Sequence, residues 1–192
     1  MILGITGGTG CGKTTLLDVI REQGGLVLDC DAIYHDLLKT DPSLLAAIED
    51  RFPGTVENGA LNRKKLGSIV FADKAALNAL NKITHSAVKQ EVLRQLQAAP
   101  ELAAIDAIGL FESGLNKLCK LTVAVTAPEK DRIARLIARD GISEEYATNR
   151  IAAQRSNEEF SRLCHYTLHN DGTKAAFREK CLAFLKEQGI MK

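Results

Sequence analysis

The sequence has no C-x-x-C pair, no long apolar run and almost no net charge. Its five cysteines are odd in number and widely spaced, which fits neither a disulfide framework nor a zinc site, so we expect reduced thiols. No apolar run approaches the roughly 20 residues of a membrane helix, and the first residues lack the segments of a signal peptide. A formal net charge of +1 provides no overall field that would attract nucleic acid or a membrane surface. We therefore predict a cytoplasmic protein with no nucleic-acid or membrane partner and no evident obligate protein partner.

The 192 residues, 45% of them hydrophobic and 26% charged, suit one globular domain, with or without an inserted subdomain. The apolar run Ile2–Thr6 predicts a strand, and helical spacing from Thr14 to the glycines at 24 and 25 predicts a helix. The apolar run at 26–31 predicts a second strand. Strand, helix and strand in this order form a βαβ unit, which favours a parallel sheet.

Residues 33–97 carry no comparable strand signal and predict helices, broken near Pro53-Gly54 and Asn58-Gly59. Further strands are predicted at 101–108, 121–126 and 166–170. Further helices are predicted at 128–141, 143–156 and 173–188. The expected fold is an α/β core with about five parallel strands, one early helical insertion and one late helical hairpin.

The loop from Gly7 to Thr14 satisfies the pattern G-x-x-x-x-G-K-[ST]. Glycines let the backbone curl so that successive amides point at phosphate oxygens, and the following helix directs its positive end at the same place. The predicted nucleotide-binding residues are Gly8, Thr9, Gly10, Cys11, Gly12, Lys13, Thr14 and Thr15. Lys13 is expected to reach the β- and γ-phosphates, and the Thr14 hydroxyl to be a ligand of Mg²⁺. The sequence therefore predicts a P-loop.

A chance glycine turn is the alternative, and the strand before the loop and the helix after it argue against that alternative. Cys11 within the loop is interpreted as a small filler residue, the other interpretation being a redox-active thiol.

A P-loop alone does not separate a GTPase, an ATP-driven motor and a small-molecule kinase. The guanine-reading pattern N-K-x-D is missing, because "NKLC" and "NKIT" lack the aspartate. A kinase needs a base, and Asp31, at the carboxyl end of the second predicted strand, is the candidate. The alternative for Asp31 is the N-cap of the following segment. Asp29 is expected to be structural.

A kinase also needs mobile basic residues, and the late hairpin supplies them. Arg132, Arg135 and Arg139 share one helical face, and Arg150 and Arg155 follow on the partner helix. The alternative is a solvated face paired with neighbouring acids, which we favour for Arg132. Arg139, beside the Asp140-Gly141 break, is favoured as a phosphate ligand.

In order along almost the whole chain, these segments resemble the dephospho-CoA kinase family. The matching stretches are "GITGGTGCGKTT", "LVLDCDAI", "NGALNRKKLGSIVFAD", "LNKITHSAV", "GLFES", "RIAAQRS" and "LHNDGT". The resemblance implies a phosphotransferase with an alcohol acceptor, which transfers a phosphoryl group from ATP to the 3′-hydroxyl of the dephospho-CoA ribose. It also implies a three-layer P-loop core at 1–32, 98–137 and 166–192, a helical CoA-binding domain at 33–97 and a lid at 138–165.

The resemblance extends to individual site residues. It places Asp31 on the catalytic aspartate of the family. Together with Lys13 of the P-loop and Arg139 of the late hairpin, Asp31 forms the predicted catalytic group. The acceptor contacts would be Asp31, Arg63, His85, Leu110, Glu112 and Arg155. Asn170 and Gly172 would lie beside the adenine.

Simpler interpretations stay open for some of these residues. Arg63 would be a surface residue, His85 a structural histidine, Glu112 the start of a short helix, and Asn170 and Gly172 only a turn. The sequence departs from the family pattern at Asn62, Ser86, Gly109 and Cys164-His165, which concerns the CoA and adenine pockets. Two rival functions remain: another small-molecule P-loop kinase, or a nucleotide-dependent regulatory protein without transfer activity.

Overall fold

The computed structural model describes residues 1–191, which fall into two compact units. The first unit comprises Met1–Leu28 and the segment from Ala99 onward, and the second comprises Asp29–Ala98. Each unit has its own apolar core. The division into core, CoA-binding domain and lid that the resemblance implies stays a prediction.

The first unit is built on a five-stranded sheet with the strand order β2-β5-β1-β6-β7. Its strands are β1 (Ile2–Thr6), β2 (Leu26–Asp29), β5 (Ala103–Asp106), β6 (Leu121–Thr126) and β7 (Tyr166–His169). The central strand β1 pairs in parallel with β5 and β6, and β6 pairs in parallel with β7. The predicted α/β fold with a five-stranded parallel sheet is confirmed.

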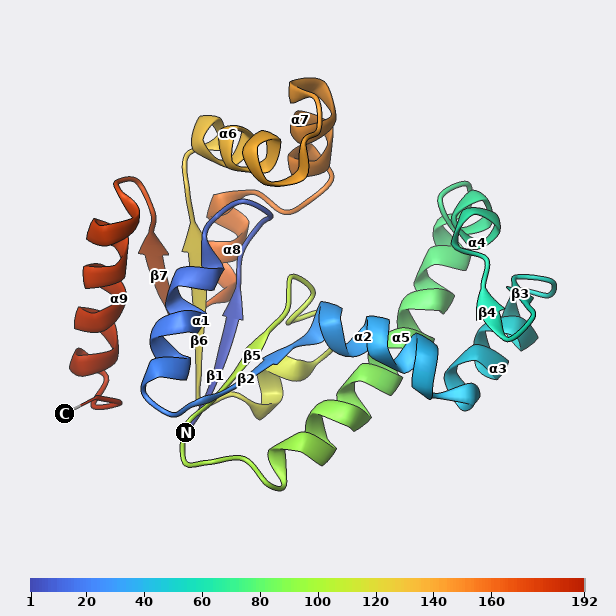
Figure 1. Cartoon of the computed structure of the whole chain (residues 1–192), viewed down its shortest axis with the longest axis horizontal. Helices are drawn as coiled ribbons and strands as arrows, with labels where there is room; N and C mark the ends of the chain where they lie inside the picture. The colour runs from blue at the N-terminus through green and yellow to red at the C-terminus, as the bar shows by residue number, and fades with distance from the viewer. Residues whose placement is uncertain (192) are drawn as a thin grey trace. The chain divides into compact units, whose positions relative to one another are not determined.

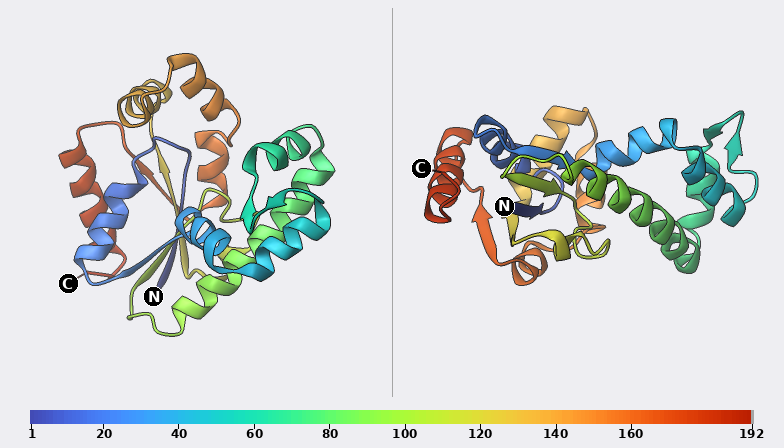
Figure 2. Two further views of the ribbon diagram at one scale, coloured as in Figure 1. Left: turned by 45° about the vertical axis from the view of Figure 1, so that its right-hand side comes forward. Right: turned by 90° about the horizontal axis from the view of Figure 1, so that it is seen from below.

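Helices cover both faces of this sheet (Figures 1 and 2). α1 (Lys13–Glu22) and α9 (Lys174–Glu187) pack together on one face, and α8 (Asn157–Leu163) packs against β6 on the other. The 3₁₀ helix η1 (Leu115–Leu118) lies against β1. Because both faces are covered, β1 and β6 are almost continuous apolar runs.

The late hairpin consists of α6 (Glu129–Asp140) and α7 (Glu144–Ala152), as predicted. The two helices bury Leu136, Ala147 and Ile151 between them, and Gly141 makes the turn with φ 65°. α8 was not predicted, although its start carries a local signal. Ser156 and Glu159 form a reciprocal capping box there.

The second unit is mostly helical (Figure 1). It contains α2 (Cys30–Thr40), α3 (Pro42–Arg51), β3 (Val56–Glu57), β4 (Ala60–Leu61), α4 (Arg63–Val70) and α5 (Lys74–Leu96). The expectation of helices without strands is wrong for β3 and β4, which form a small antiparallel hairpin. Asn58 and Gly59 have φ 52° and 76°, and an Asn-Gly pair with two positive φ values is typical of such a tight turn.

The second strand ends earlier than predicted, because the chain turns into α2 at Cys30. The side chain of Asp29 accepts hydrogen bonds from the amides of Asp31 and Ala32, each at 3.0 Å. Asp29 is therefore the N-cap of α2, which confirms its structural role and removes the N-cap alternative for Asp31. Within residues 1–191, no helix combines the length and the apolar character needed to cross a membrane.

Candidate phosphate-binding site

The P-loop connects β1 to α1, and several of its positions have backbone conformations that strongly favour glycine. Gly7, Gly10 and Gly12 have φ values of 137°, 77° and 91°, which side chains rarely allow. A Cβ atom on Gly7 would also clash with the carbonyl oxygen of Val125 on β6. The glycines therefore provide both the curled backbone and the close approach to the sheet.

Several amides of this loop have no acceptor within the described chain. Cys11 and Thr15 donate to the carbonyls of Gly8 and Gly12 at 3.3 and 3.1 Å. Across residues 1–191 we find no acceptor for the amides of Gly10, Gly12, Lys13 and Thr14. Such a cluster of unpaired donors at the start of a helix is typical of a phosphate site.

The side chain of Lys13 folds back over the loop. Its Nζ donates to the carbonyl oxygen of Gly7 at 3.1 Å and lies 3.8 Å from Oδ1 of Asp106. Asp106 ends β5, the neighbour of β1, and is not among the predicted site residues. A carboxylate at the carboxyl end of a buried strand is the signal that could have identified this residue.

Within residues 1–191 no disulfide joins any of the five cysteines, so their side chains are thiols. Cys11 is buried, and burial raises the pKa of its thiol despite the opposing charges of Arg132 and Lys13. A protonated, inaccessible thiol favours the filler interpretation of Cys11.

Arg132 lies against the loop, contrary to the expectation of a solvated face. Its side chain is buried, with 3% of the residue exposed, and its Nε donates to the carbonyl oxygen of Thr9 at 2.9 Å. Its Nη2 lies 3.4 Å from Oε1 of Gln154. Arg132 and Leu136 are one helical turn apart on the buried face of α6, so the amphipathic period of the helix directs Arg132 inward. Arg135 on the same helix donates to the carbonyl oxygen of Gly10 at 3.0 Å.

Arg139 lies at the exposed end of α6 and bonds to its neighbour rather than to the P-loop. Its Nε donates to Asp140 at 2.6 Å, and Arg150 donates to the same carboxylate at 2.9 Å. Arg139, and after it Arg150, lower the pKa of Asp140 to about 2. The hairpin therefore has an ion cluster at the turn between α6 and α7.

Arg155 and Glu112 form an ion pair in the first unit, with Nε and Oε1 2.7 Å apart. Glu112 lies in a turn and η1 begins only at Leu115, so the alternative in which Glu112 starts a short helix is wrong. Leu110 is fully buried nearby in sequence, and a Cβ atom on Gly4 would touch its side chain.

Asn170 follows β7 and connects this strand to the P-loop. Its Nδ2 donates to the carbonyl oxygen of Cys11 at 2.9 Å, and 5% of the residue is exposed. Its Oδ1 is buried and finds no partner in residues 1–191. Asn170 is thus more than a turn residue, whereas Gly172 lies in the exposed loop that precedes α9.

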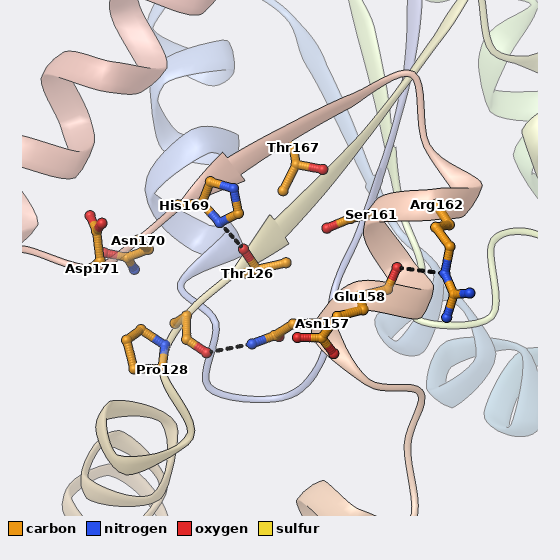
Figure 3. Close-up of a pocket in the computed structure, with 11 residues that line it drawn as sticks. Thr126, Pro128, Asn157, Glu158, Ser161, Arg162, Thr167, His169, Asn170 and Asp171 are labelled. Atoms are coloured by element: carbon orange, nitrogen blue, oxygen red, sulfur yellow. Dashed lines mark hydrogen bonds between the residues drawn. The ribbon is translucent and has the colours of Figure 1, made fainter.

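A cavity of about 590 Å³ opens where β6 and β7 end (Figure 3). It is lined by Thr126, Ala127, Pro128, Asn157, Glu158, Ser161, Arg162, Thr167, His169, Asn170 and Asp171. Two hydrogen bonds order its wall: His169 Nδ1 to Thr126 Oγ1 at 2.8 Å, and Asn157 Nδ2 to the Ala127 carbonyl oxygen at 2.9 Å. The cavity therefore adjoins Asn170, at the side where the resemblance implies the adenine.

The remaining predicted residues, Asp31, Arg63 and His85, belong to the second unit. Asp31 is in the first turn of α2, and Arg63 begins α4, where its Nη2 lies 3.1 Å from Nδ1 of His35. His85 is half-buried within α5. The structure thus divides the predicted acceptor residues between the two units.

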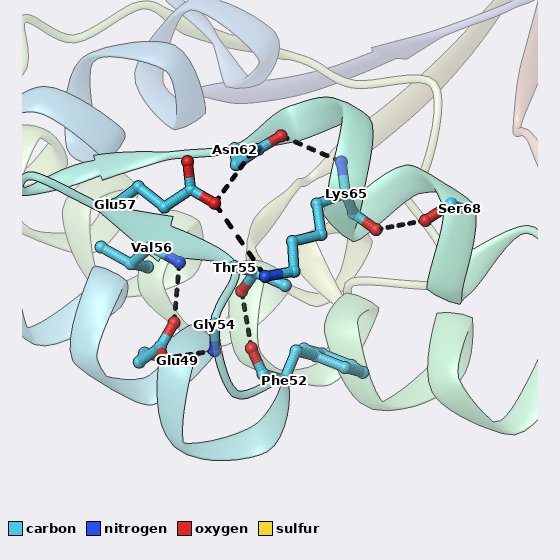
Figure 4. Close-up of polar contacts among 9 residues, drawn as sticks. All are labelled: Glu49, Phe52, Gly54, Thr55, Val56, Glu57, Asn62, Lys65 and Ser68. Carbon is cyan, nitrogen blue, oxygen red and sulfur yellow. Dashed lines mark hydrogen bonds and ion pairs between the residues drawn. The ribbon is translucent and has the colours of Figure 1, made fainter.

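Two departures from the family pattern have local explanations. Asn62 caps α4 by accepting from the Lys65 amide at 3.0 Å, and its Nδ2 donates to Glu57 at 3.2 Å (Figure 4). An aspartate could accept the first bond but not donate the second. His165 links the start of β7 to β6, because its ring Nδ1 accepts a hydrogen bond from the Thr122 amide at 3.0 Å.

The family model and the similar curated proteins agree on one family. The family model described as dephospho-CoA kinase matches residues 1–176. A dephospho-CoA kinase from Symbiobacterium thermophilum is 37% identical over 194 residues, which cover 94% of this chain and 81% of the relative. The crystal structure of TT1252 from Thermus thermophilus has 32% identity and a TM-score of 0.81, covering 97% of both chains. A dephospho-CoA kinase from Campylobacter jejuni has 26% identity and a TM-score of 0.68, covering 99% of this chain and 98% of its own.

Proposed function

The chain belongs to the dephospho-CoA kinase family, and we propose that it transfers the γ-phosphoryl group of ATP to the 3′-hydroxyl of dephospho-CoA, giving CoA and ADP. The single observation that most supports nucleotide binding is the group of amides without an acceptor at Gly10, Gly12, Lys13 and Thr14. Four donors at a helix start, with an ammonium beside them, suit the phosphates of a nucleotide. The proposed location is the cytoplasm.

In this proposal the P-loop holds the triphosphate. The amides between Gly8 and Thr15 bind phosphate oxygens, and Lys13 moves from the Gly7 carbonyl to the β- and γ-phosphates. Phosphoryl transfer requires little covalent chemistry from the protein, so these donors act by positioning and by stabilising charge.

Thr14 is the proposed protein ligand of Mg²⁺. The residue is exposed in the first turn of α1, so its hydroxyl can reach a metal ion bound to the phosphates. No group of three or more His, Cys, Asp or Glu side chains in residues 1–191 could hold a metal ion. This fits Mg²⁺, which usually keeps several waters and takes few protein ligands beside phosphate. When bound, the ion would neutralise charge on the transferring group.

Asp31 is the proposed base, which orients or deprotonates the attacking hydroxyl. The Asp29 cap fixes the start of α2 and thereby the backbone of Asp31. Arg63, His85, Leu110, Glu112 and Arg155 are the proposed acceptor contacts, with the helical residues 33–97 as the CoA-binding part. Arg139 would leave Asp140 and support the transferring charge when the lid, residues 138–165, closes.

Asn170 and Gly172 are the proposed adenine contacts. The Oδ1 atom of Asn170 is a buried acceptor without a partner in residues 1–191, and an amino group of the base could donate to it.

Acceptor-dependent ADP release tests this function. Purified protein with Mg-ATP would be given dephospho-CoA, adenosine, AMP, CMP or uridine, and the product's mass would be determined. We expect release only with dephospho-CoA, with one phosphate added to its ribose. Activity on a nucleoside or nucleotide instead would keep the P-loop assignment and replace the acceptor. ATP binding without any transfer would favour the regulatory alternative.

Asp31→Asn separates catalysis from binding. We expect a large loss of kcat with ATP affinity nearly unchanged, because the substitution removes the base but none of the phosphate donors. Equal losses of turnover and ATP affinity would contradict the role of Asp31.

A further inference from the structure

Arg132 is a buried cation with no acidic partner in the described chain. Its side chain makes two hydrogen bonds, to the carbonyl oxygen of Thr9 at 2.9 Å and to the neutral side chain of Gln154 at 3.4 Å, and no ion pair joins it to a carboxylate within residues 1–191. Buried charges in proteins are normally paired, because desolvation of a lone charge is costly. The missing counter-ion should therefore be supplied by something that binds beside Arg132.

The surroundings of Arg132 show which kind of counter-ion fits. Three cations, Lys13, Arg132 and Arg135, contact the loop, whereas Asp106 is the one carboxylate of the first unit that pairs with them in the described residues. The excess positive charge lies beside loop amides that have no acceptor. A polyanion such as a triphosphate would satisfy both the amides and the charge.

Arg132 and Gln154 also hold the loop in shape. Gln154 Oε1 accepts from the Thr9 amide at 2.8 Å, while Arg132 binds the Thr9 carbonyl oxygen, so both peptide groups of Thr9 are restrained. A Cβ atom on Gly10 would lie 2.9 Å from the carbonyl oxygen of Arg132, which shows how closely α6 approaches the loop.

We propose that Arg132 and Gln154 clamp the Thr9 peptide groups and that the buried guanidinium of Arg132 is the counter-charge of the bound triphosphate. Arg132 is then a nucleotide-binding residue, and Gln154 a positioning residue that must remain neutral to leave the charge available. This inference rests on the proposed nucleotide binding and is independent of the acceptor's identity.

Two substitutions test the proposal. Both should lower the affinity for polyphosphate, and the second should do so without lowering the stability of the protein. Arg132→Gln removes the charge, and we expect ATP and inorganic tripolyphosphate each to bind at least about tenfold more weakly. Gln154→Glu places a carboxylate against Arg132 in the same volume. We expect this variant to resist urea at least as well as the original protein, yet to bind both polyphosphates at least about tenfold more weakly.

Binding would be measured by titration calorimetry without acceptor, so that failure of the dephospho-CoA assay could not obscure the result. Arg178→Gln is the matched control, because Arg178 is a half-buried arginine on α9 paired with Glu22 on α1. Unchanged polyphosphate affinity in both variants, or a loss in the control of the same size, would overturn the proposal. If Arg132→Gln fails to fold, Gln154→Glu decides alone: higher stability with unchanged affinity would make Arg132 a purely structural residue.

Discussion

Lys13 has two partners in the structure that do not belong to a substrate, the Gly7 carbonyl oxygen and the Asp106 carboxylate. Both contacts keep the ammonium above the loop while the side chain is mostly buried, with 14% of it exposed. A phosphate group is a stronger acceptor because it carries two negative charges. The Lys13 ammonium therefore already lies close to the proposed phosphate site.

Replacement of Lys13 tests this role at the level of one residue. Lys13→Met keeps most of the length of the side chain and removes its charge, and we expect kcat/KM for ATP to fall at least about a hundredfold. Steady-state kinetics with dephospho-CoA would measure the loss. Lys186→Met, an exposed lysine on α9, is the control, and a comparable loss in the control would contradict a specific role of Lys13.

The Asp140 carboxylate makes a pH-dependent contribution at the α6–α7 turn. Arg139 and Arg150 lower its pKa to about 2 from the ordinary 3.8. A lowered pKa in the folded state means that this stabilisation is complete above about pH 4 and is lost as the pH falls through about 2. Carboxyl NMR titration should show no midpoint for Asp140 above pH 3.

Arg139→Gln should raise the Asp140 midpoint more than Arg150→Gln does, because Arg139 is the larger cause of the shift. The opposite order would contradict the assignment of these contacts.

At the scale of elements, the loop between β1 and α1 depends on backbone geometry more than on side chains. Gly7 and Gly24 both have positive φ, 137° and 77°, but only a Cβ atom on Gly7 would meet a neighbour, the carbonyl oxygen of Val125. A Cβ atom on Gly24 would find nothing within 4 Å. Substitutions at these two glycines therefore separate the loss of stability caused by a strained φ from the loss caused by a steric clash.

We expect Gly24→Ala to lower the free energy of unfolding by about 1–2 kcal/mol, the usual cost of a left-handed backbone. Gly7→Ala should cost more than about 4 kcal/mol, because the loop must also move away from β6. Urea unfolding would measure both values. Equal losses would show that close packing against β6 does not restrict the loop.

At the scale of the whole molecule, the chain consists of a sheet-based unit that carries the P-loop and a helical unit that carries Asp31, Arg63 and His85. The proposed reaction therefore uses residues from both units. Each ligand should protect a different set of backbone amides from hydrogen exchange, because a bound ligand suppresses the local opening of the segments it contacts.

Hydrogen exchange would test this division. We expect a non-hydrolysable ATP analogue with Mg²⁺ to protect the P-loop and α6, and dephospho-CoA to add protection within residues 33–97. Protection by dephospho-CoA confined to the first unit would contradict the proposed CoA-binding part.

Much of the fold could be predicted because its signals are local. The P-loop, the boundaries of β6 and the late hairpin depend on consecutive residues whose spacing sets their conformation. Errors arose where a short element left little periodicity, as in α8 and the β3–β4 hairpin, or where a cap ended a strand early, as at Asp29.

The sequence by itself determined the chemistry of the P-loop, since curled backbone, lysine and hydroxyl all come from eight consecutive residues, Gly7 to Thr14. Only the tertiary structure decided the partners of that loop. Arg132, Gln154 and Asn170 contact it from 123 to 159 positions away along the chain, through the packing of α6 and the order of the strands. Local spacing could not distinguish Arg132 from a surface arginine, because burial depends on what packs against a helix face, and distant segments supply that packing.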